Sequence, residues 1–84
     1  METPAALLRR LGLAQTGWTQ MRLAEAVGVD PAVINRMLHG HHGITAKMAM
    51  RLSKALGTTP ELWMQAQNMV DLEAAKTELE MGKA

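Results

Sequence analysis

Proline placement constrains the fold of this chain more than any other sequence feature. Each of the three prolines directly follows a residue that can cap a helix, in the pairs Thr3-Pro4, Asp30-Pro31 and Thr59-Pro60. A threonine or aspartate at the cap accepts a hydrogen bond from a free backbone N–H. Proline suits the first helical position, because its missing N–H would have no intrahelical partner there. The three pairs therefore predict three helix starts.

Threonines and glycines divide the rest of the chain. Thr19 and Thr45 can cap two further helices. Helix ends that need a left-handed residue are expected at Gly17, Gly28, Gly40 and Gly57. Phenylalanine and tyrosine are absent, and apolar residues recur at helical spacing. The sequence thus predicts an all-α fold with helices at about 4–15, 20–27, 31–38, 46–56 and 60–80. The end of the first helix stays open, because interior Gly12 costs about 1 kcal/mol relative to alanine.

The 84-residue chain has the composition of a globular protein, and we expect a single domain over residues 1–84. Its residues are 48% hydrophobic and 20% charged, which is typical of chains that fold. The absence of cysteine excludes disulfides and thiolate metal ligands. No apolar run long enough to span a bilayer and no signal-peptide pattern is present. We therefore expect a cytoplasmic location and no membrane partner.

Charge is divided unevenly along the chain. Residues 1–59 carry seven basic and three acidic side chains, a net charge of +4, whereas residues 60–84 carry two basic and five acidic side chains, a net charge of −3. This division suits a body that faces phosphates and an acidic C-terminal segment that can meet a basic protein. An ordinary solvated surface is the alternative, because differences of a few charges are common.

Residues 19–40 have the spacing of a helix-turn-helix motif. Its two short helices are expected to pack together through their apolar faces. These faces contain Leu23 and Val27 on the first helix and Ile34, Met37 and Leu38 on the second. The small side chain of Ala24 permits a close approach of the two helices, and Gly28 can adopt the positive φ that reverses the chain. Trp18 stands before the first helix at the spacing of a hydrophobic staple, so a structural role is expected for it.

The outer face of the second helix, residues 31–38, remains free to contact DNA. Such a helix enters the major groove with its N-terminal residues nearest the base edges. Arg36 can contact guanine O6 and N7, and Asn35 can make the corresponding pair of bonds to adenine. Pro31 and Ala32 offer only small apolar contacts, for instance to a thymine methyl group. DNA shape is therefore expected to contribute to specificity.

Phosphate contacts are expected around this helix. Gln20 can bond a phosphate beside free backbone N–H groups, or it is a solvated first-turn residue. His39, His41 and Lys47 can supply donors to the DNA backbone. Three histidines lie in the segment 39–42, but without cysteine or a well-placed carboxylate we expect no metal and no cofactor. The candidate DNA contacts are Thr19, Gln20, Pro31, Ala32, Asn35, Arg36, His39, His41 and Lys47.

Several motifs point to a family. They are Pro4, Leu8-Arg9, Trp18-Thr19-Gln20, Leu23-Ala24, Val27-Gly28-Val29, Gly43-Ile44-Thr45-Ala46, Arg51-Leu52 and the run from Ala55 to Trp63. Together they resemble the HigA antitoxins, within the Cro and phage-repressor (XRE-like) class of helix-turn-helix domains. The resemblance covers roughly residues 4–72. It is most specific from Gly43 to Trp63 and on to Gln67 and Asp71. The chain departs from the family at His39-Gly40-His41-His42, where asparagine-glycine followed by basic residues is usual.

The resemblance implies a five-helix, lambda-repressor-like DNA-binding domain with an extended C-terminal helix. It also implies a type II antitoxin: a dimer that represses its own operon and holds a small HigB-type toxin, an mRNA-cleaving ribonuclease, in an inactive complex. The alternative is a stand-alone transcriptional regulator without a toxin. We do not expect an enzyme, because the chain has no glycine-rich phosphate loop and its histidines lack a nucleophile at sensible spacing.

The predicted C-terminal helix, residues 60–80, has two apolar parts. Its first part is expected to pack beneath the fourth helix and contains Leu62, Trp63, Ala66, Met69 and Val70. Its second part is a thinner stripe of Leu72, Ala75 and Leu79, too sparse to bury much surface alone. A second copy covering this stripe would give a homodimer on a palindromic operator, with recognition helices roughly 34 to 36 Å apart. A small basic toxin is the other partner considered, and a frayed helix end is the remaining alternative.

Overall fold

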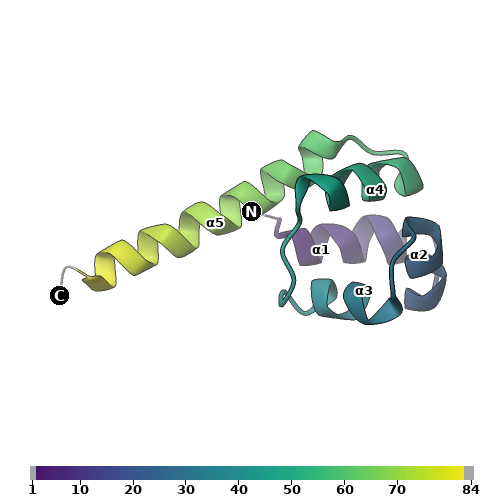
Figure 1. The fold of residues 1–84 in the computed structure, drawn as a ribbon, viewed down its shortest axis with the longest axis horizontal. Helices are drawn as coiled ribbons and strands as arrows, with labels where there is room; N and C mark the ends of the chain where they lie inside the picture. The colour runs from purple at the N-terminus through teal and green to yellow at the C-terminus, as the bar shows by residue number, and fades with distance from the viewer. Residues whose placement is uncertain (1, 83–84) are drawn as a thin grey trace.

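The computed structural model describes residues 2–82, and every regular element within them is helical (Figure 1). The elements in order are α1 (Pro4–Leu8), the π-helix η1 (Arg9–Ala14), α2 (Gln20–Val27), α3 (Pro31–Leu38), α4 (Ala46–Leu56) and α5 (Pro60–Gly82). The predicted all-α class and the extended C-terminal helix are confirmed. Each of the five α-helices also begins at the residue that the capping pattern predicted.

Capping explains these starts. The side chains of Thr19, Asp30 and Thr45 each accept a hydrogen bond from a backbone N–H in the first turn of the following helix, at 2.8 to 3.1 Å. Two of the expected glycines, Gly28 and Gly57, end α2 and α4 with φ of 83° and 68°. Only glycine adopts such angles without strain.

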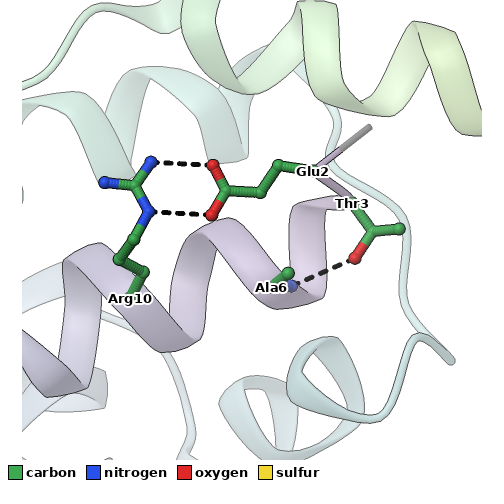
Figure 2. Close-up of polar contacts among 4 residues, drawn as sticks. All are labelled: Glu2, Thr3, Ala6 and Arg10. Atoms are coloured by element: carbon green, nitrogen blue, oxygen red, sulfur yellow. Dashed lines mark hydrogen bonds and ion pairs between the residues drawn. The ribbon is translucent and has the colours of Figure 1, made fainter.

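The N-terminal residues are fixed by two sets of bonds (Figure 2). Thr3 Oγ1 accepts from the N–H of Ala6 at 3.1 Å and so caps α1. The guanidinium of Arg10 donates to both oxygens of Glu2, at 2.8 and 2.7 Å. This pairing lowers the pKa of the Glu2 carboxyl below its ordinary value of 4.5, although the pair is exposed.

The first predicted helix does not keep α-helical geometry to its end. After Leu8 the chain continues as η1, in which the N–H of Gln15 donates to Arg10 O across five residues at 3.0 Å. Gly12 is buried in this stretch, and a Cβ placed on it would lie 2.9 Å from a methyl carbon of Leu23. The helix therefore neither frays nor ends at Gly12. A π-helical stretch holds the glycine against α2 instead.

The core lies where α1, α2, α3, α4 and the first half of α5 meet. Its fully buried side chains include Leu8, Leu23, Ile34, Leu52 and Trp63. The indole Nε1 of Trp63 donates to Thr58 Oγ1 at 2.8 Å, so the one polar atom of this ring is satisfied. The structural role expected for Trp63 is confirmed.

The second half of α5 leaves the body. Figure 1 shows it projecting away from the other helices, and residues 71–82 are all exposed. The described chain consequently measures 46 × 22 × 21 Å. Met69 was expected beneath α4, but it is 41% exposed, because it lies about 120° around the helix from buried Trp63. None of the helices described is long and apolar enough to cross a membrane.

Candidate nucleic-acid interface

The turn between α2 and α3 has the geometry that its sequence predicts. Gly28 in the left-handed conformation reverses the chain, and the N–H groups of Gly28 and Val29 both donate to Ala24 O, at 2.8 and 3.0 Å. Ala24 itself is only 1% exposed, between the two short helices. A larger side chain there would separate them. The turn therefore fixes α3 at a defined angle to α2.

The outer face of α3 is open to solvent. Pro31, Ala32, Asn35 and Arg36 are all exposed, whereas Ile34, Met37 and Leu38 are buried beneath them. Arg36 belongs to neither of the two ion pairs within residues 2–82, which join Arg10 to Glu2 and Arg22 to Glu25. The Arg36 guanidinium thus keeps its donors available for an external acceptor.

Gln20 and Asn35 are brought together across the two helices. Nδ2 of Asn35 donates to Oε1 of Gln20 at 3.4 Å, a long hydrogen bond between two exposed side chains. Both amides keep polar atoms free, because Gln20 retains its two N–H donors and Asn35 retains its carbonyl oxygen and one N–H. The sequence alone assigns these residues separately, to a phosphate and to adenine, and does not predict that they meet.

The loop after α3 arranges its histidines against its own backbone. Nδ1 of His39 lies 2.8 Å from Asn35 O, and Nδ1 of His42 lies 2.8 Å from Gly43 O. A carbonyl oxygen can only accept, so each Nδ1 carries the proton. Neutral His39 then presents a lone pair at Nε2, and it donates to a phosphate there only when the ring is protonated. Among the described residues, no group of three or more His, Asp or Glu is placed to bind a metal ion.

The remaining candidates lie at helix starts and beside Gly40. Thr19 caps α2, and its side chain is already engaged with the N–H of Arg22. Lys47 is the second residue of α4 and is exposed. His39 and His41 stack with nearly parallel rings 6.5 Å apart, one on each side of Gly40. The segment 42–46 therefore separates His39 and His41 from Lys47 along the chain.

Two side chains help to position this surface through contacts that the sequence did not predict. NH2 of Arg9 donates to Leu38 O at 3.0 Å and so satisfies a carbonyl in the last turn of α3. Gln67, on α5, accepts from the N–H of Ile44 at 2.8 Å. Each contact joins elements that are distant in sequence. Such contacts depend on tertiary packing, which the local pattern does not contain.

Trp18 supports the start of α2. It is half-buried against the core, as expected for a hydrophobic staple. The guanidinium of Arg22 lies 5.1 Å from the centroid of the ring and also pairs with Glu25 at 3.0 Å. Arg22 is therefore committed to its own helix and is a weaker candidate for DNA contact than Arg36.

Comparison with known proteins identifies relatives of this arrangement. The family model described as "Helix-turn-helix" matches residues 8–63. The antitoxin HigA-1 of Vibrio cholerae is 42% identical over 60 residues, which cover 71% of this chain and 56% of that protein. The chain thus spans little more than half the length of this relative.

Two solved structures resemble the whole arrangement. The antitoxin GraA matches with a TM-score of 0.82 and 37% identity, over 89% of this chain and 81% of that chain. The Pseudomonas aeruginosa antitoxin HigA, solved with the higBA promoter, matches with a TM-score of 0.86 and 28% identity, over 95% of this chain and 87% of that chain. Both comparisons extend well beyond the α2–α3 motif.

Proposed function

Because this chain belongs to the helix-turn-helix family, we propose that it is an antitoxin of the HigA type, which binds an operator in its own promoter and represses that operon. One observation carries the proposal: the outer face of α3 is exposed from its first residue, with Arg36 outside both ion pairs. Membership in this family also agrees with the expectation that the chain is not an enzyme.

Within this function, the base contacts are assigned to Arg36 and Asn35. Arg36 donates to guanine O6 and N7, and the Gln20–Asn35 pair presents its free polar atoms to an adenine and to the neighbouring phosphate. Lys47 and protonated His39 contact phosphates, with His41 beside them. Three further residues complete the surface: Thr19 through the backbone at the start of α2, and Pro31 and Ala32 through apolar contacts.

A homodimer formed by the projecting part of α5 is the proposed assembly. Leu72 and Leu79 are 61% and 68% exposed, so the rest of residues 2–82 leaves them largely uncovered. Leu72 follows Trp63 by about two and a half helical turns, so the stripe faces away from the side that packs on the body. A twofold axis through this stripe gives two α3 helices and hence a palindromic operator.

The proposed second partner is a basic, HigB-type ribonuclease. The acidic charge of residues 60–84 supports this, since opposite charge attracts a basic protein. A stand-alone regulator remains the second candidate function. Expression of the flanking genes separates the two: a neighbour that arrests growth alone, but not when co-expressed with this chain, identifies the antitoxin. A neighbourhood without such a gene identifies the regulator.

A footprint on the promoter of its own operon tests operator binding. The proposal predicts protection of two inverted half-sites whose centres lie about one helical turn apart, in the presence of excess unrelated DNA. Protection that is uniform along the promoter, or that unrelated DNA removes, would overturn it.

A further inference from the structure

A chain of two hydrogen bonds joins α5 to the loop between α3 and α4. The backbone N–H of Ile44 donates to Oε1 of Gln67 at 2.8 Å, and Nε2 of Gln67 donates to Oδ1 of Asp71 at 2.9 Å. Gln67 also lies against Gly43, where a Cβ would come 3.7 Å from its amide. Asp71 is the first residue of the exposed, projecting part of α5. We call these two bonds the Gln67 relay.

The relay holds the part of the loop that neither helix end fixes. At the end of α3, the N–H groups of Gly40 and His41 donate back to carbonyl oxygens of that helix, at 3.1 and 2.8 Å. The next helix begins at the cap Thr45. Between them, the backbone of Ile44 is bonded to Gln67 while its side chain is only 4% exposed. An unpaired backbone N–H at this position would be costly.

The proposed phosphate contacts lie on both sides of the held segment. His39 and His41 precede it, and Lys47 follows it on the first turn of α4. A rigid duplex presents its phosphates at fixed separations, so simultaneous contact requires a fixed separation of these side chains. Ile44 lies between the two sets of side chains along the chain, and its backbone N–H is bonded to α5.

We propose that Gln67 is a positioning residue for DNA binding, oriented by Asp71, which fixes the loop so that both groups of phosphate contacts engage together. This inference rests on the operator binding proposed above. Asp71 orients the amide because a carboxylate accepts only from Nε2, which leaves Oε1 facing Ile44. Neither residue touches DNA in this arrangement, and the effect passes through the loop backbone.

Three variants separate this role from a general effect of charge. Gln67→Glu replaces the donor to Asp71 with a second carboxylate. The repulsion between the two carboxylates moves residue 67 away from the Ile44 N–H. Adding Asp71→Asn restores both hydrogen bonds, because the amide N–H of Asn at position 71 can donate to the carboxylate at position 67. The double variant also has the net charge of the wild type. Gln65→Glu makes the same chemical change at an exposed position on α5, so it adds the same charge without touching the relay.

Operator binding is measured over a range of salt concentration, together with hydrogen exchange of the Ile44 amide. We expect Gln67→Glu to bind about tenfold more weakly than Gln65→Glu, with faster exchange at Ile44. The slope of log K against log salt becomes shallower by about 0.9 for each phosphate that the protein no longer neutralises. The double variant recovers affinity, slope and exchange protection.

Two results overturn the inference while leaving the proposed function intact. One is an operator affinity of Gln67→Glu equal to that of Gln65→Glu, and the other is a double variant that stays as weak as Gln67→Glu. A wild-type protein without preference for its operator overturns the proposed function, and this inference falls with it.

Discussion

At position 12 a side chain larger than that of glycine would crowd two buried leucines. An added Cβ would lie 2.9 and 3.2 Å from methyl carbons of Leu23 and Leu8, and both leucines are fully buried. The sequence suggested only that a glycine weakens this helix. Which residue approaches the glycine depends on how η1 packs against α2, and that is not encoded in the local pattern. Helix propensity therefore favours alanine at position 12, whereas packing against Leu23 favours glycine.

Gly12→Ala tests that packing. The added methyl group gains about 1 kcal/mol of helix propensity but must displace Leu23, so we expect a net loss of about 1 to 2 kcal/mol in the free energy of unfolding. Urea denaturation measures it. Gly82→Ala is the matched control, because nothing lies within 4 Å of that position. Equal stability of Gly12→Ala and the wild type would show that the contact is not tight.

The Glu2–Arg10 pair predicts a stability difference that depends on pH. Its carboxyl has a pKa lowered below 4.5 in the folded chain, first through the hydrogen bond from Arg10. A carboxyl whose pKa is lower in the folded chain than in the unfolded chain stabilises the fold at pH values above the unfolded-state pKa. This stabilisation is lost as the pH falls through the folded-state pKa. Thermal unfolding of Glu2→Gln should therefore show a small deficit at neutral pH that disappears in acid. Glu78→Gln, on the projecting part of α5, serves as control. A deficit that does not shrink as the pH falls below 4.5 contradicts the assignment.

Among the elements, the five α-helices were predictable because their starts carry chemical signals at fixed offsets. Pro31 after Asp30, or Ala46 after Thr45, identifies a first turn without any knowledge of the fold. The π-helical geometry of η1 carries no such signal. The contacts of Arg9 and Gln67 were equally unpredictable, because each joins an element to another that is distant in sequence.

Arg9 is expected to stabilise α3 at its C-terminal end. Its guanidinium bonds Leu38 O at 3.0 Å, where a positive charge also interacts favourably with the helix dipole. Arg9→Ala should lower the free energy of unfolding by about 1 kcal/mol in chemical denaturation. Lys54→Ala removes an exposed charge from the last turn of α4 and should cost less. The contact is unimportant if the two variants unfold alike.

The most conspicuous feature of the whole molecule is the second half of α5, which projects away from the other helices (Figure 1). Residues 71–82 are all exposed, and a helical segment without tertiary contacts gains little stability from packing. The proposed dimer covers the Leu72, Ala75 and Leu79 stripe and explains why this segment is apolar on the side that faces away from the core.

Leu72→Glu combined with Leu79→Glu should convert a dimer to a monomer. Two carboxylates in an apolar seam have no partner there, and burying an unpaired charge is strongly unfavourable. Sedimentation velocity measures the change in mass. Thr77→Glu with Met81→Glu places the same charges on another side of the helix and should leave the dimer intact. A wild-type protein that sediments as a monomer, or a Leu72/Leu79 variant that still dimerises, contradicts the proposed interface.

The proposed operator binding depends most on the recognition of base sequence by Arg36 of α3. The most direct measurement compares Arg36→Ala with Lys47→Ala in competition titrations of operator against scrambled DNA. Arg36→Ala should lower the preference for operator by about 5- to 150-fold, the range for a bidentate guanine contact. Lys47→Ala should weaken binding to both DNAs alike, because a phosphate contact carries no base preference. An unchanged preference for operator in Arg36→Ala would contradict this role of Arg36.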